Sequence, residues 1–282
     1  MRFGCCPGLA SFVPPTLEGQ EDSLSVAHAK QCERIPPILK LLAEAGFDYV
    51  ELGVGTAAPE QPEADFRRFL DAIEGSPLRA EVFSSFIPPW VRVVGPEADW
   101  ARIDAYVTVA VERVARAGAD RIIFGSGGAR TCPEGFPREE ARDQLRRFLN
   151  LAGDHCERHG IVLCIEPLNA SETNMVNRVS EATAWAREIA RPCVQVLADC
   201  FHMGMESESY ASIVDAGAFL KHAHVADKGR RYPADFGYDI DGFLTALKQA
   251  GYDGRVSIEA NFADLATEAP LGLARIKRAA TL

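Results

Sequence analysis

Eight short apolar runs recur along this chain of 282 residues, and they constrain its fold more than any other feature. Runs that are apolar nearly throughout are typical of strands buried on both faces, as in a parallel sheet covered by helices. The runs are RFGCC (2–6), YVEL (49–52), AEVF (80–83), RIIF (121–124), IVLCIE (161–166), VQVLAD (194–199), LKHAHV (220–225) and RVSIEA (255–260).

The stretches between these runs have helical spacing. In IPPILKLLAEAG (35–46), Ile35, Leu39, Leu42 and Ala43 share one helical face, and Gly46 predicts a left-handed C-cap. A helix end, a glycine, a turn containing aspartate and an apolar run recur in AEAGFDYV, ARAGADRI and KQAGYDGRV. We therefore predict an α/β chain that forms a single (β/α)8 TIM barrel domain over residues 1–282.

Length alone also allows two smaller domains, because a barrel of eight strand-helix units typically takes roughly 250 residues. No linker or low-complexity segment divides the sequence. A GxGxxG motif does not follow the first run, which disfavours a dinucleotide-binding sheet.

Charge and composition exclude several classes of function. The chain has 30 Lys and Arg against 40 Asp and Glu, a net charge of -10, so we expect no nucleic-acid partner. No apolar run approaches the roughly 20 residues of a membrane span, so we expect no membrane partner. The first residues, MRFGCCPGLASFVPP, lack a signal-peptide pattern, which favours a cytoplasmic protein. The eight cysteines form no CxxC pair, and we expect reduced thiols.

Four metal-capable side chains lie at the last or next-to-last position of the last four apolar runs: Glu166, Asp199, His224 and Glu259. The carboxyl ends of barrel strands share one mouth, so these side chains should converge there. Each alone could be a helix cap or a solvated loop residue. Three carboxylates together are costly unless a cation offsets their repulsion, which favours one shared divalent metal.

The donor atoms narrow the choice of metal. Three carboxylates and one imidazole form an oxygen-rich set, which favours Mn²⁺ first and allows Mg²⁺, Co²⁺ or Zn²⁺. Four protein ligands in an octahedral site leave two positions for adjacent carbonyl and hydroxyl oxygens of a small-molecule substrate.

Four stretches in this order, IEPLNASETN (165–174), ADCFHM (198–203), HAHVADKGRR (222–231) and GYDGRVSIEA (251–260), resemble the xylose isomerase-like TIM barrel superfamily. Within it the chain is similar to ketose 3-epimerases, sugar phosphate isomerase/epimerases and hydroxypyruvate isomerase-like proteins. The resemblance implies metal ligation by the same four residues. It also implies substrate contacts from Glu172, His202 and Arg230, which could otherwise be a loop acid, a helix-side histidine and a surface arginine.

The resemblance implies a metal-dependent sugar isomerase or epimerase that acts on a small keto sugar or related hydroxy-carbonyl compound. Glu166 and Glu259 would be the catalytic pair, one removing a proton and the other returning it to a metal-bound cis-enediolate. A lyase or dehydratase acting on a keto sugar or keto-inositol is the alternative, because the same enediolate could expel a leaving group. Related barrels often pair into dimers, so a homodimer is a possible partner arrangement.

Three further features bear on the substrate. Asn169 precedes Ala170 and Ser171, where the 3-epimerases usually have an Asn-Arg-aromatic segment. The sequence therefore does not identify the substrate. In the loop GSGGARTCPEGF (125–136), Arg130 would bind a carboxylate or phosphate, or would face solvent from a turn. SFVPP (11–15) and SFIPPW (85–90) look like rigid rim loops, in which Trp90 would stack on a sugar or anchor the loop.

Two other classes of protein share this scaffold. Apurinic-site endonucleases bring extra histidines at the ends of strands three and four, where this sequence reads VFSS and IFGS. A non-catalytic binding protein is also compatible with the fold, but all four candidate ligands are retained.

Overall fold

The computed structural model describes residues 1–8 and 21–281, which contain a closed barrel of eight parallel strands. Neighbouring strands pair in chain order, and the eighth closes on the first. The segment SFVPP (11–15), expected to be a rim loop, lies outside the described residues. The strands are β1 (Arg2–Cys6), β2 (Tyr49–Gly53), β3 (Ala80–Ser84), β4 (Arg121–Phe124), β5 (Val162–Ile165), β6 (Val194–Asp199), β7 (Leu220–Val225) and β8 (Arg255–Glu259).

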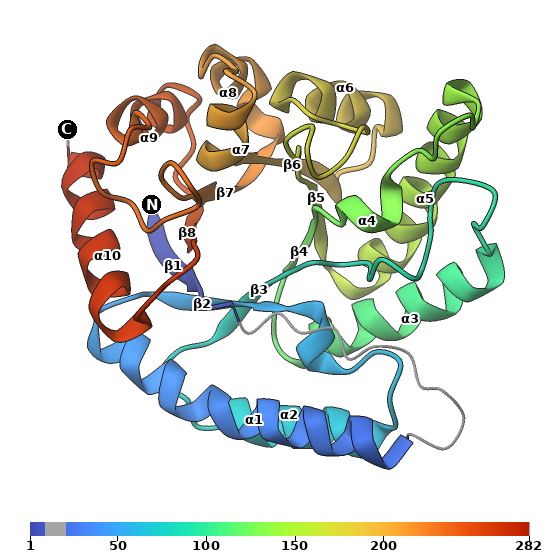
Figure 1. Ribbon diagram of the computed structural model, residues 1–282, viewed down its shortest axis with the longest axis horizontal. Coiled ribbons are helices and arrows are strands. Elements are labelled where there is room, and N and C mark those ends of the chain that lie inside the picture. Colours follow the sequence, from blue (N-terminus) through green and yellow to red (C-terminus); the bar gives the residue numbers. More distant parts are fainter. Residues whose placement is uncertain (9–20, 282) are drawn as a thin grey trace.

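Helices surround the strands in a ring, as Figure 1 shows. This arrangement confirms the predicted barrel. The helices are α1 (Glu21–Glu44), α2 (Glu63–Ile73), α3 (Trp100–Arg116), α4 (Gly127–Arg130), α5 (Arg138–His159), α6 (Val179–Ile189), α7 (Cys200–Met205), α8 (Ala211–Ala216), α9 (Ile240–Gln249) and α10 (Leu265–Thr281), with short 3-10 helices η1 (Val54–Ala57) and η2 (Gly217–Phe219). None of these described helices combines the length and apolar character needed to cross a membrane.

The predicted repeat of helix, glycine and strand is present three times. Gly46, Gly118 and Gly251 follow α1, α3 and α9 and have φ of 87°, 87° and 72°. Such positive φ values are accessible to glycine without steric cost, so the chain can turn at once into the next strand.

The barrel has two separate apolar layers. Outward side chains of the strands pack against the helices in the main core, to which Val50 and Leu52 of β2 belong. Inside the barrel a smaller buried cluster contains Tyr49, Val82, Ile123, Cys164 and Leu197. All eight cysteines are buried free thiols, as predicted.

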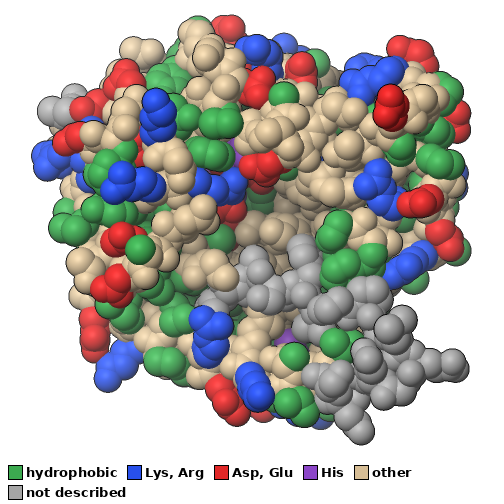
Figure 2. All heavy atoms as spheres, in the orientation of Figure 1, with side chains coloured by type: hydrophobic (Ala, Val, Ile, Leu, Met, Phe, Trp, Pro, Cys, Tyr) green, Lys and Arg blue, Asp and Glu red, His purple; other side chains and the backbone are tan. Residues whose placement is uncertain are grey.

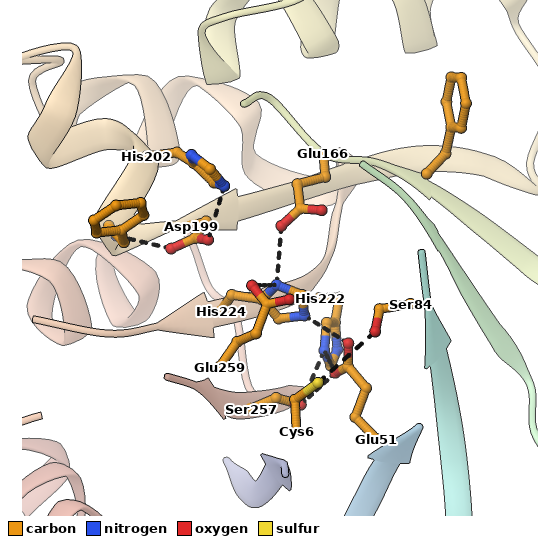
Figure 3. Close-up of polar contacts among 12 residues, drawn as sticks. Cys6, Glu51, Ser84, Glu166, Asp199, His202, His222, His224, Ser257 and Glu259 are labelled. Carbon is orange, nitrogen blue, oxygen red and sulfur yellow. Dashed lines mark hydrogen bonds and ion pairs between the residues drawn. The ribbon is translucent and has the colours of Figure 1, made fainter. Parts of the chain in front are cut away.

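Strand periodicity explains how polar groups enter the same interior. Alternate residues of a strand point to the same face. His222 and His224 of β7 therefore both face the interior, as do Ser257 and Glu259 of β8, and Figure 3 shows these four side chains inside the barrel. The later residue of each pair lies nearer the carboxyl end of its strand, where the mouth opens.

Candidate metal and substrate site

The four strand-end residues predicted to share a metal lie together at the carboxyl ends of their strands (Figure 3). Each of Glu166, Asp199, His224 and Glu259 offers one ligand atom, and these atoms all lie within 4.8 Å of one another. Nδ1 of His224 is 3.0 Å from Oε1 of Glu166 and 3.3 Å from Oε2 of Glu259. The cluster could therefore hold a metal ion, and its donors are those expected from the sequence.

Local structure holds two of the four candidate ligands in place. Asp199 ends β6 and caps α7, because its Oδ1 accepts a hydrogen bond of 2.7 Å from the backbone N–H of Phe201. Glu166 follows β5 and has room for its carboxylate because Gly125, directly after β4, has no side chain. A Cβ at Gly125 would lie 2.2 Å from Oε2 of Glu166, far inside van der Waals contact.

The two glutamates of the cluster have different electrostatic surroundings. Burial raises the pKa of Glu166 above its ordinary value, against the lowering effect of His224. Burial acts the same way on Glu259, but Arg230 and His224 together lower the pKa of that carboxyl to about 2. Burial would lower the pKa of His224, but Glu51, Glu259 and Glu166 raise it well above its usual value. This part of the interior therefore favours positive charge.

The three residues expected to contact substrate lie beside the cluster. Arg230 donates to Oε2 of Glu259 at 2.5 Å and to Oε1 of Glu172 at 3.4 Å. His202 is buried, and its Nε2 lies 3.6 Å from Oδ2 of Asp199. Among the described residues this nitrogen has no hydrogen-bond partner. A buried donor without a partner costs free energy unless something fills the site, so the nitrogen is available to a ligand.

A pocket of about 250 Å³ opens beside these residues. In the space-filling view, which keeps the orientation of Figure 1, acidic and basic side chains border a hollow near the middle of the face (Figure 2). Loops after β3 and β4 supply small or apolar groups to the pocket, and β8 and the segments after β5 and β7 supply the charged ones. The lining residues are Ser85, Ile87, Pro89, Gly125, Ser126, Gly127, Gly128, Glu166, Leu168, Glu172, Arg230 and Glu259.

Arg130 requires a correction. Its side chain is fully buried and does not face the pocket. The guanidinium donates to the backbone carbonyls of Phe124 at 2.8 Å, Glu166 at 2.7 Å and Met175 at 3.1 Å. Because these bonds use its donors, Arg130 ties β4 to the loop after β5, and this structural role replaces the expected contact with a substrate anion.

Trp90 lies in the loop after β3, as expected, and its indole N–H donates to Oε2 of Glu60 at 2.8 Å. The side chain is partly buried against the main core and lies outside the described lining of the pocket. This placement matches the loop-anchor alternative better than the stacking alternative.

Sequence reasoning missed three polar residues near the cluster. Asn169 donates from its side-chain amide to Glu172 and to Nδ1 of His202, both at 2.9 Å. Glu51 and His222 are fully buried below the cluster, and each is joined to it through hydrogen bonds. An acid within an apolar strand, and a histidine two residues before another, were the available signals.

Comparison with known proteins identifies the family. The model of the xylose isomerase-like TIM barrel matches residues 39–278. An L-ribulose 3-epimerase of Methylomonas sp. (strain DH-1) is 26% identical over 228 residues, covering 77% of this chain and 75% of that protein. A D-psicose 3-epimerase of Agrobacterium fabrum (strain C58) is 32% identical over 126 residues, 44% of each chain.

A solved structure of D-psicose 3-epimerase in the presence of D-fructose shares the fold. It has a TM-score of 0.81 at 19% sequence identity, and the match covers 99% of both chains. The family model spans most of the chain, including all four candidate ligands. This chain belongs to the xylose isomerase-like TIM barrel family.

Proposed function

We propose that this protein is a divalent-metal-dependent isomerase or epimerase that acts on a small keto sugar or a related hydroxy-carbonyl compound. One observation carries the proposal. Four metal-capable ligand atoms lie within 4.8 Å of one another, beside a pocket of about 250 Å³. The reaction class is supported by the similar proteins, which are named as 3-epimerases of L-ribulose and D-psicose.

The donors suit a hard divalent ion. Glu166, Asp199 and Glu259 would supply oxygen ligands and His224 a nitrogen ligand, which favours Mn²⁺ and allows Mg²⁺, Co²⁺ or Zn²⁺. When bound, the ion would polarise a substrate carbonyl and make the neighbouring C–H bond more acidic.

Glu166 and Glu259 are the proposed proton carriers. One glutamate, as the carboxylate, removes the proton from the carbon beside the carbonyl and leaves an enediolate, and the other glutamate, as the carboxylic acid, then donates a proton. Donation to the same carbon from the opposite face inverts that carbon, which is epimerisation. Donation to the former carbonyl carbon, with the proton of the neighbouring hydroxyl passing to the former carbonyl oxygen, moves the carbonyl, which is isomerisation.

His202, Arg230 and Glu172 would bind the oxygens of the substrate. Nδ1 of His202 accepts from the backbone N–H of Asn169 at 3.1 Å, so the hydrogen of a neutral ring lies on Nε2. That Nε2–H can donate to a substrate oxygen. Arg230 donates to Glu259, which limits the directions open to that carboxylate.

Solvent-deuterium incorporation tests the proposal. Purified protein with Mn²⁺ in D₂O should exchange a proton beside the carbonyl of at least one member of a panel containing D-fructose, D-psicose, L-ribulose and hydroxypyruvate. Inversion at the labelled carbon indicates an epimerase, a shifted carbonyl an isomerase, and loss of a leaving group the lyase alternative. The absence of exchange across the panel in Mn²⁺-loaded protein would contradict the proposal.

The proposal extends to the domain organisation, the cellular location and the oligomeric state. We propose that the domain extends over residues 1–282, that the protein is cytoplasmic, and that it can pair into a homodimer. Light scattering on the purified chain tests the last of these, and a monomer mass at micromolar concentration would contradict it.

A further inference from the structure

A second polar cluster lies inside the barrel, below the four candidate ligands. It is centred on Glu51 in the middle of β2, which is fully buried, and it includes His222 and Ser257. Oε1 of Glu51 is 2.9 Å from Nε2 of His224, and Oε2 is 2.9 Å from Nε2 of His222. The hydroxyl of Ser257 donates to Oε2 at 2.6 Å. Figure 3 shows Glu51 on the side of His224 that faces away from Glu166.

These contacts determine where the imidazole hydrogens lie. An ionised carboxylate only accepts hydrogen bonds, so both imidazoles must carry a hydrogen on the Nε2 that faces Glu51. In neutral His224 the lone pair is then on Nδ1. This nitrogen is the one that lies 3.0 Å from Glu166 and 3.3 Å from Glu259, where the metal would bind.

The surroundings of Glu51 are built to keep it charged and fixed. A buried carboxylate is costly unless it receives hydrogen bonds, and Glu51 receives them from His222, His224 and Ser257. The hydroxyl of Tyr49 lies 2.9 Å from that of Ser257, so a further donor supports the serine. Because each member is fully buried, little freedom remains for the carboxylate or for the ring of His224.

We infer that Glu51 is a positioning residue for the metal site. Its carboxylate fixes the tautomer and the ring orientation of His224, so that Nδ1 is presented to the ion, and it places a negative charge beneath that ion. A carboxylate on the far nitrogen of a ligating histidine has both effects in metalloproteins. The inference rests on the proposed function, because it requires a metal at the cluster of Glu166, Asp199, His224 and Glu259.

Metal binding by Glu51→Gln tests this inference without relying on turnover. Glutamine has nearly the same shape, but the two imidazoles face different oxygens of Glu51, and in glutamine one of these positions becomes an NH2 group that cannot accept. We expect Mn²⁺ affinity, measured by isothermal titration calorimetry, to fall about 10- to 100-fold, the usual effect of losing such a partner. Ser257→Ala is the matched control, because it removes another donor to Glu51 and leaves the contact with His224, so its loss of affinity should be smaller.

The outcomes separate the two proposals. Wild-type protein that does not bind Mn²⁺ would contradict the proposed function. Wild-type protein that binds Mn²⁺, with Glu51→Gln binding equally well, would contradict this inference alone. Thermal unfolding of both variants shows whether they remain folded.

Nitrogen NMR of wild-type protein tests the same inference without any variant. With ¹⁵N-labelled histidine and Zn²⁺ as a diamagnetic ion, His224 should show a hydrogen on Nε2 and metal on Nδ1. The opposite assignment would overturn the inference. So would a second bound ion held by Glu51, His222 and His224, whose ligand atoms also lie within 4.8 Å of one another, because Glu51 would then be a ligand.

Discussion

The two halves of the barrel present different chemistry at the same level of the fold. The carboxyl ends of all eight strands meet at one mouth. Strands β5 to β8 bring three carboxylates and an imidazole to that mouth, at Glu166, Asp199, His224 and Glu259. Strands β1 to β4 end in residues that belong to no such group within the described ranges: Cys6, Gly53, Ser84 and Phe124.

The difference shows that a site needs space as well as ligands. The loops after β3 and β4 line the pocket with small or apolar residues, including Gly125, Gly127 and Gly128. A Cβ at Gly127 would lie 2.7 Å from the backbone oxygen of Glu172, as the one at Gly125 would meet Glu166. One half therefore supplies the charged groups, and the other leaves room for them and for a substrate.

Replacing a proton carrier in the charged half should have the largest effect. Glu259→Gln keeps the shape of the side chain but removes its basic oxygen, so turnover should fall by about 10³-fold or more. Because Glu259 lies at the mouth, we expect this variant to keep the wild-type fold, as measured by its circular dichroism spectrum. Glu139→Gln on the exposed first turn of α5 is the control and should keep full activity. Undiminished turnover in purified Glu259→Gln would refute its assigned role.

A smaller loss should follow when the open half is filled. Gly125→Ala places a methyl group against the carboxylate of Glu166, which must move. Displacement of a reacting group by about 1 Å can cost about 10²-fold, so we expect a loss of that order in kcat/KM. Steady-state kinetics and Mn²⁺ titration measure the effect. If Gly125→Ala had the wild-type kcat/KM and the wild-type Mn²⁺ affinity, the absence of a side chain at this position would be unimportant.

The smallest effect is expected at the end of β3. The hydroxyl of Ser84 lies 3.8 Å from the sulfur of Cys6, and thiols are weak partners in hydrogen bonds. Ser84→Ala should therefore change kcat/KM by less than about twofold, which corresponds to less than about 0.4 kcal/mol in activation free energy. A large loss of Mn²⁺ affinity in this variant would mean that the end of β3 also takes part in metal binding.

Much of this arrangement could be predicted from the sequence. The eight strands were predictable because buried parallel strands are apolar nearly throughout, and each predicted run overlaps an observed strand. The four candidate ligands were predictable because each lies at the last or next-to-last position of such a run. Strand ends converge in a closed barrel whatever the details of pairing.

Residues inside the strands were not predictable in the same way. Glu51 lies within a run that is otherwise apolar, and the sequence does not show which residue it faces. Its contact with His222 joins β2 to β7 across the interior, and that contact depends on the register of the closed barrel. Arg130 lies in a glycine-rich loop whose sequence indicates exposure, but four backbone carbonyls accept from its buried guanidinium. The alternation of residues along a strand predicts which face a side chain occupies, but it does not predict which residue that side chain contacts across the interior.

Anomalous diffraction from crystals soaked in Mn²⁺ tests the metal site most directly. The account predicts one strong peak per chain, within coordination distance of Glu166, Asp199, His224 and Glu259. A peak elsewhere, or none at a saturating concentration of the ion, would contradict it.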